Sequence, residues 1–159
     1  DGALVPLDQQ DRSRWDHAKI AEGHRLVREL LARNTPGPYQ IQAAIAAVHA
    51  DAPDAARTDW GQIVALYDQL LVVAPSDVVR LNRAVALAEV HGPAVGLDAV
   101  DALSALDSYH LWHATRADLL VRLGRDQDAA SAYDAAIALT DNEAEGSFLR
   151  RRRDDVGAP

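Results

Sequence analysis

The chain has 159 residues, a net charge of −8 at pH 7 and no cysteine. The length suits one domain with a substantial core, and the negative charge disfavours direct binding to nucleic acid or to an anionic membrane. The absence of cysteine excludes a disulfide, a thiolate zinc site and a cysteine nucleophile. No apolar run approaches a membrane span and no signal peptide is visible, so we expect a cytoplasmic protein. Because the chain starts at Asp1 and contains no Met, we expect an excised domain of a longer protein.

The expected elements are helices, because apolar residues recur at helical spacing and nowhere alternate at a strand period for long. Residues 1–12 are expected to form an extended lead-in and residues 157–159 a disordered tail. Helices are predicted over residues 13–33, 39–50, 59–74, 77–91, 93–106 and 142–153, and a helical hairpin over residues 109–140. The predicted N-caps are Ser13, Thr58, Ser76 and Asn142. The run Asn34-Thr35-Pro36-Gly37-Pro38 is expected to stop the first helix.

The hairpin over residues 109–140 carries the strongest pattern. Gly124, Ala129, Tyr133 and Ala136 follow the small and large spacing of a tetratricopeptide hairpin. Small residues let two helix backbones approach closely, and Tyr133 is expected to fill the groove between them. We attribute Gly61 to close packing for the same reason. The pattern predicts an all-α fold over residues 13–156, a right-handed solenoid of about eight helices whose last helix covers the open end.

Few residues suggest catalysis. His110 and His113 lie three apart with Asp118 further on, a spacing that can share a metal. However, there is no HExxH pattern, no phosphate-binding glycine loop and no obvious pair of catalytic carboxylates. We therefore expect a protein that is not an enzyme and that holds no metal and no cofactor. A small-molecule sensor or hydrolase that uses the His110 and His113 region is the alternative.

Polar residues interrupt several apolar helices. A polar group inside a packed helix pair must find a partner or line a groove, so two interpretations stay open: structural networks between helices, or a surface that binds a partner. The candidates for partner binding are Gln40, Gln42, His49, Asn82, Arg83, Arg116 and Asp118. Of these, Gln42, His49, Asn82 and Arg83 are the residues we expect in the groove. The basic run Arg150–Arg153 either contacts phosphate or forms a solvated helix C-terminus.

The segment LDQQDRSRWD, residues 7–16, resembles the Asp-Gln-Asp-Arg-Ser-x-Trp signature of one group of bacterial sigma factors. These are extracytoplasmic-function sigma factors, of the sigma-70 family, that carry a C-terminal tetratricopeptide-like extension. A second glutamine, Gln10, departs slightly from the signature. Further stretches similar to the family are GPYQIQAAIAAVHA (37–50), TDW (58–60), LNRAVAL (81–87), YHLWHATRADLLVRLGR (109–125) and FLRRR (148–152).

The resemblance implies a regulatory extension that acts through protein contacts. Its expected partners are the sigma factor's own N-terminal domains, core RNA polymerase, or a small YCII-like protein, with no direct DNA contact by this fragment and no membrane. The lead-in residues Asp8, Gln9, Asp11, Arg12 and Trp15 would then join two domains. A free-standing tetratricopeptide adaptor with no tie to transcription is the alternative.

Overall fold

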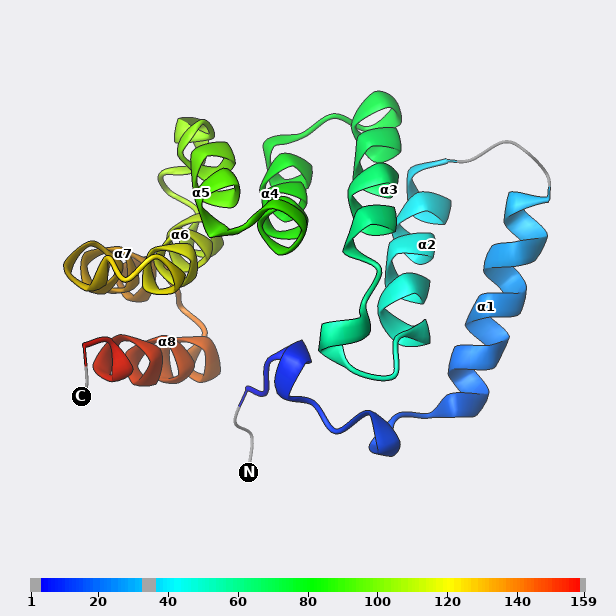
Figure 1. Ribbon diagram of the computed structural model, residues 1–159, viewed down its shortest axis with the longest axis horizontal. Helices are drawn as coiled ribbons and strands as arrows, with labels where there is room; N and C mark the ends of the chain where they lie inside the picture. Colours follow the sequence, from blue (N-terminus) through cyan, green and yellow to red (C-terminus); the bar gives the residue numbers. More distant parts are fainter. Residues whose placement is uncertain (1–3, 33–36, 158–159) are drawn as a thin grey trace. The chain divides into compact units, whose positions relative to one another are not determined.

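The computed structural model describes residues 4–32 and 37–157 of the chain, and over these ranges it contains eight α-helices, four short 3-10 turns and no strand (Figure 1). The predicted all-α class and the predicted number of helices are confirmed. The chain divides into two compact units. We call Val5–Val79 the N-terminal unit and the part from Arg80 onward the C-terminal unit. Because the handedness and curvature of a solenoid depend on how the units are arranged, both stay predictions.

The N-terminal unit begins with two 3-10 turns rather than the predicted extended lead-in. These turns, Leu7–Gln9 and Arg12–Arg14, precede α1 (His17–Leu31), α2 (Pro38–Asp51), a third turn (Ala55–Arg57) and α3 (Trp60–Val73). Helix α1 packs on α2, and α2 and α3 form an antiparallel hairpin (Figure 1). The buried residues of this hairpin are Ile41, Ala44, Ile45 and Val48 of α2 and Ile63 and Leu70 of α3. Small and branched apolar side chains therefore fill the space between the two helices.

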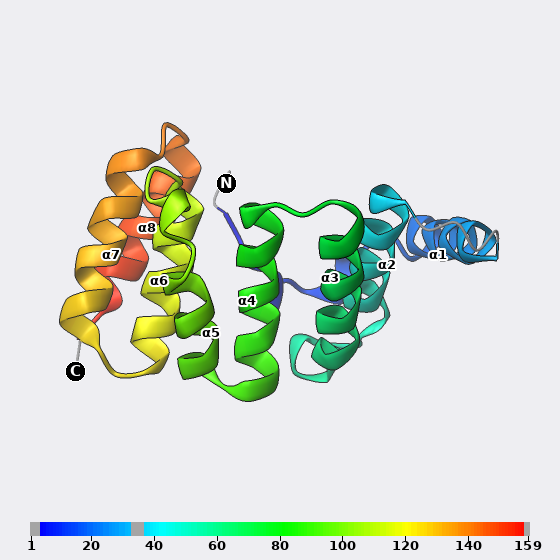
Figure 2. The same cartoon turned by 90° about the horizontal axis from the view of Figure 1, so that it is seen from above.

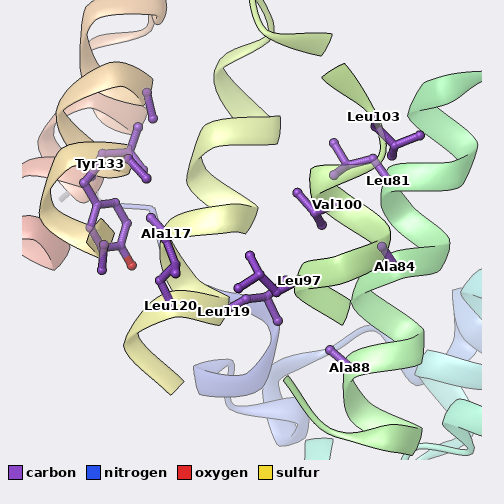
Figure 3. Close-up of a cluster of buried hydrophobic side chains, with 14 residues drawn as sticks. Leu81, Ala84, Ala88, Leu97, Val100, Leu103, Ala117, Leu119, Leu120 and Tyr133 are labelled. Atoms are coloured by element: carbon purple, nitrogen blue, oxygen red, sulfur yellow. The ribbon is translucent and has the colours of Figure 1, made fainter. Parts of the chain in front are cut away.

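The C-terminal unit contains most of α4 (Asp77–His91), together with α5 (Pro93–Asp101), a 3-10 turn (Ser104–Leu106), α6 (His110–Arg122), α7 (Asp126–Leu139) and α8 (Glu143–Asp155). Helices α6, α7 and α8 lie side by side (Figure 2). One apolar cluster runs through all five helices. In Figure 3, Leu97 and Val100 of α5 lie between α4 and Leu119 of α6.

The predicted hairpin around Gly124 is confirmed. Gly124 has φ 69°, a left-handed conformation that favours glycine. The N–H of Arg125 donates to the Leu120 carbonyl and that of Gly124 to the Val121 carbonyl, both at 2.9 Å, which satisfies the last carbonyls of α6. Tyr133 is 2% exposed between the helices. The two alanines of the pattern, Ala129 and Ala136, are fully buried beside it.

Two of the four predicted N-caps are wrong. Helix α1 is capped by Asp16, whose carboxylate accepts from the Lys19 N–H at 3.1 Å, while Ser13 lies in the preceding 3-10 turn. Helix α3 is capped by Asp59, whose carboxylate accepts from the Gln62 N–H. In each case a carboxylate follows the predicted hydroxyl and offers a charge-assisted hydrogen bond near the positive end of the helix.

The other two predicted caps are confirmed. The Ser76 hydroxyl accepts from the Val79 N–H at 3.2 Å at the start of α4. The Asn142 side chain accepts from the N–H groups of Ala144 and Glu145 at the start of α8. At both positions the capping residue comes where the helical spacing of apolar residues is interrupted, so the sequence shows where the next helix begins.

Some predicted boundaries need correction or lie outside the described residues. The helix from Pro93 ends at Asp101 instead of residue 106, because the chain turns there into the short 3-10 segment. The Val100 carbonyl near the end of α5 accepts from the Leu103 N–H and also from the indole N–H of Trp112, both at 2.9 Å. Residues 34–36 of the predicted stop, the predicted helix end at residue 33 and most of the tail over residues 157–159 lie outside the described residues. The last two residues of the predicted stop, Gly37 and Pro38, are the N-cap and the first residue of α2.

The glycine that allows close helix packing is Gly96, not Gly61. An added Cβ at Gly61 would meet only the Asp59 carboxylate, at 3.5 Å, so this exposed glycine packs against no neighbouring helix. An added Cβ at Gly96 would lie 2.5 Å from the Ala88 Cβ and 3.1 Å from the Ala84 carbonyl oxygen. Helices α4 and α5 therefore approach so closely at this point that only glycine fits.

Candidate functional site

The side chain of Arg12 joins the lead-in to the end of α2. Its Nη1 donates to the His49 carbonyl at 2.7 Å and also to the Ala52 carbonyl. The last carbonyls of a helix lack partners within the helix and carry the negative end of its dipole, so a cation is favoured there. The guanidinium also lies over the Trp15 ring, 4.9 Å from its centroid. Arg12 thus makes a hydrogen-bonded and a cation–π contact at once.

The neighbouring acidic residues shape the lead-in locally. The Asp11 carboxylate accepts from both the N–H and the hydroxyl of Ser13, at 3.0 and 2.6 Å. These hydrogen bonds lower the pKa of the Asp11 carboxyl below its usual value. Asp8 and Gln9 lie exposed in the first 3-10 turn. Of the five predicted linker residues, Arg12 is hydrogen-bonded to the end of α2.

A shallow pocket of about 310 Å³ opens beside this contact. It is lined by Arg12, Ser13, Trp15, His17, Ala50, Asp51, Ala52 and Pro53. These residues belong to the lead-in, to the start of α1, to the end of α2 or to the two positions after it. The sequence analysis did not single out this place, because its residues are far apart along the chain. The carbonyls that accept from Arg12 belong to His49 and Ala52, 37 and 40 positions later in the chain, and this spacing corresponds to no recognisable motif.

Two histidines flank the end of α2. His49 packs edge-on against Trp60 of α3, with ring centroids 5.1 Å apart. Burial and, second, the charge of Arg12 lower the pKa of His49 below its ordinary value, so its imidazole is neutral at pH 7. His24 of α1 places Nδ1 3.3 Å from the Asp51 carboxylate. Among the described residues, His49 Nδ1 and His24 Nε2 are buried without a hydrogen-bond partner.

The seven predicted partner-binding residues are divided between the two units. Gln40, Gln42 and His49 lie on α2, where Gln42 is exposed and the other two are half-buried. Asn82 and Arg83 lie on α4, where Asn82 is exposed and Arg83 half-buried. A groove shared by Gln42, His49, Asn82 and Arg83 therefore stays a prediction.

Arg116 and Asp118 form ion pairs between helices. Arg116 Nε lies 2.7 Å from the Asp101 carboxylate of α5. Asp118 pairs with Arg152 of α8, whose Nε also donates to the Tyr133 hydroxyl at 3.3 Å. Arg116 and Asp118 therefore fit the first of the two interpretations, in which polar side chains form structural networks between helices.

Two arginines of the basic run Arg150–Arg153 connect α8 to its neighbouring helices. Besides Arg152, Arg153 lies 3.1 Å from the Asp134 carboxylate of α7, and Arg150 donates to the Ser147 hydroxyl at 3.3 Å. Three of the four arginines are therefore engaged within the C-terminal unit. The acidic partners Asp118 and Asp134 lie on α6 and α7, but the sequence does not show which helices meet.

The two histidines of the possible metal region point to different contacts. His110 Nε2 lies 3.0 Å from the Glu145 carboxylate without hydrogen-bond geometry, which makes it an ion-pair contact when the ring is protonated. His113 Nε2 lies 2.7 Å from the Asp107 carbonyl oxygen, and its ring packs against Trp112. Over residues 4–32 and 37–157, the structure brings together no group of three or more residues of the types that could hold a metal ion.

Comparison with known proteins gives two matches. Residues 1–31 match a family of unknown function, DUF6596. An uncharacterized protein of Rhizobium meliloti (strain 1021) is 43% identical over 158 residues. That similarity covers 99% of this chain but 37% of the relative, so the chain spans little more than a third of the relative's length. No solved structure matches. Within the described ranges, no helix is long and apolar enough to cross a bilayer.

Proposed function

We propose that this chain is the regulatory, protein-binding domain of a bacterial extracytoplasmic-function sigma factor. The observation that carries the proposal is the signature-like segment Asp8–Asp16, which leads directly into antiparallel helical hairpins. The larger size of the Rhizobium relative, of which this chain matches 37%, suits a domain attached to further protein. The net charge of −8 suits contact with protein better than with DNA.

The expected partners are the sigma factor's own N-terminal domains, core RNA polymerase or a small YCII-like protein, in the cytoplasm. Exposed side chains at Gln42 and Asn82 would supply hydrogen bonds to a bound polypeptide, and exposed apolar side chains would supply contact area. Tyr39 and Val72, 82% and 83% exposed, are the most exposed large apolar residues of the N-terminal unit.

A transcription assay tests the proposal. The gene's product would be prepared with and without residues 1–159, and core polymerase binding and transcription from its own promoter would be measured for both. The proposal requires that removal of these residues changes at least one of the two. Equal polymerase binding and equal transcription would defeat it.

The alternative of a free-standing adaptor makes a different prediction. An adaptor would show no affinity for core polymerase or for sigma domains in any form. Titration of purified core polymerase into the labelled 159-residue chain, followed by fluorescence anisotropy, separates the two possibilities when combined with the transcription assay. Variants Gln42→Ala and Asn82→Ala then test whether each of these exposed side chains takes part in any binding observed.

A further inference from the structure

The lead-in of the N-terminal unit has almost no buried surface of its own. From Val5 to Asp16 no residue is buried, and only Pro6, Arg12 and Trp15 are half-buried. Val5 and Leu7 remain 50% and 41% exposed. Hydrophobic burial therefore contributes little to holding this segment on the helices, and specific contacts must hold it.

Arg12 supplies those contacts across 37 and 40 positions of sequence, to the carbonyls of His49 and Ala52. The guanidinium is suited to this place because it is planar, stays charged and can stack on an aromatic ring while donating several hydrogen bonds. Carboxylates around it are engaged by other groups. Asp54, whose pKa is lowered mainly by its hydrogen bond to Arg57 and also by the charge of Arg12, accepts from the Arg57 guanidinium at 2.9 and 2.6 Å. Asp11 is engaged by Ser13, and Asp16 by the N–H of Lys19.

We propose that Arg12 is a positioning residue that straps the segment Val5–Asp16 to the C-terminal end of α2, with Trp15 as the surface against which its guanidinium rests. The folded N-terminal unit then begins at the lead-in and not at α1, so the predicted linker residues are attached to the end of α2. The strap rests on a few half-exposed contacts, which makes it the part of this unit that opens at the lowest cost in free energy. The inference is independent of the proposed function, because all of these contacts lie within one unit.

Millisecond hydrogen exchange on the complete 159-residue chain tests the strap. The reporters are the N–H groups of Arg14 and Trp15, which donate to the carbonyls of Asp11 and Arg12 at 3.1 Å. In Arg12→Ala we expect exchange at these amides to accelerate by about tenfold or more, since a hydrogen-bonded charge is lost. The matched control is Arg14→Ala, an exposed arginine in the same 3-10 turn, which should leave the exchange of Trp15 unchanged. Helices α6 and α7 serve as an internal reference.

Equal exchange at these amides in Arg12→Ala and the wild type would overturn the proposal. Should Arg12→Ala fail to fold, Arg12→Lys decides. Lysine keeps the charge but lacks the planar fork and the stacking on Trp15, so the strap requires faster exchange in Arg12→Lys than in the Arg14→Ala control. Exchange in Arg12→Lys no faster than in that control would show that any cation suffices and would refute the assigned role of the guanidinium.

Discussion

The two units of this chain hold their helices together by different means. The C-terminal unit has one continuous apolar cluster that draws buried residues from α4, α5, α6, α7 and α8. Alanines and Gly96 let its helices approach closely, and Tyr133 fills the remaining groove. The N-terminal unit buries a smaller set on α2 and α3, and none of the α1 side chains that the structure describes is buried. Its lead-in and α1 depend more on polar contacts, above all those of Arg12 and the pair of His24 and Asp51.

The difference indicates where the chain can open. Elements with few buried apolar contacts unfold locally at low cost, whereas elements in a continuous core open only with their neighbours. We therefore expect α1 and the lead-in to exchange their amides sooner than α6 and α7. Interaction with a partner would be regulated most easily in the N-terminal unit, because less packing has to be broken there.

The largest expected effect tests the continuous core. Tyr133→Ala removes a side chain that is 2% exposed and should destabilise the C-terminal unit by about 3–5 kcal/mol, the usual cost of deleting a buried aromatic ring. Urea denaturation followed by circular dichroism and by hydrogen exchange of α6–α8 measures it. Tyr39→Ala is the control, since Tyr39 is 82% exposed and its removal should change stability by less than about 0.5 kcal/mol. A small loss for Tyr133→Ala would mean that the hairpin can collapse around the cavity.

The next prediction compares one glycine from each unit. Gly96→Ala should cost about 1–3 kcal/mol, because its Cβ would lie 2.5 Å from that of Ala88. Gly23→Ala in α1 should stabilise the chain by about 0.5–1 kcal/mol, since no atom lies within 4 Å of an added Cβ and alanine is the better helix former. The same substitution should thus have opposite signs in the two units. Denaturation curves of both variants and of the wild type measure the two effects. An unchanged free energy of unfolding for Gly96→Ala would show that α4 and α5 can move apart without loss of stability.

A smaller effect concerns how α8 is held. Arg152→Gln removes the contacts to Asp118 and to the Tyr133 hydroxyl, and should cost about 1 kcal/mol at most, because the paired side chains are 34% and 48% exposed and solvent screens them. Arg151→Gln, an exposed neighbour, should stay within about 0.5 kcal/mol of the wild type. Exchange at the α8 amides reports both. If the two variants behave alike, apolar contacts such as those of Leu149 hold α8 without help from the arginine.

The fold was predictable to the extent that it depends on local patterns. The turn at Gly124, the buried Tyr133 and the caps at Ser76 and Asn142 follow from spacing and residue type, and the structure confirms them. The errors at Ser13 and Thr58 arose where two polar residues near the helix start competed and the carboxylate was the stronger acceptor.

The contacts of the candidate site were not predictable for a different reason. Arg12 meets the end of α2 only after the chain has folded, and nothing near it in the sequence names His49 and Ala52 as its acceptors. Gly61 and Gly96 look alike in sequence, and only the neighbouring helix shows which of them must be glycine. The seven polar candidates for partner binding were selected by residue type, and their role remains a prediction.

The smallest expected effect is a dependence of stability on pH through His49. Burial, and second the charge of Arg12, lower its pKa in the folded chain below the ordinary value of 6.5. Between its folded-state pKa and 6.5, His49 therefore binds more protons in the unfolded chain than in the folded chain. The contribution of His49 to the free energy of unfolding is fully present above about pH 6.5 and is lost as the pH falls toward the folded-state pKa. His49→Gln should flatten this part of the stability profile, measured by urea denaturation between pH 5 and 8, and Arg12→Ala should flatten it partly because one of the two causes is removed. If the free energy of unfolding of His49→Gln falls with pH as steeply as that of the wild type, the acid sensitivity arises from another group. The polar contacts at the end of α2 would then not distinguish the N-terminal unit from the C-terminal unit.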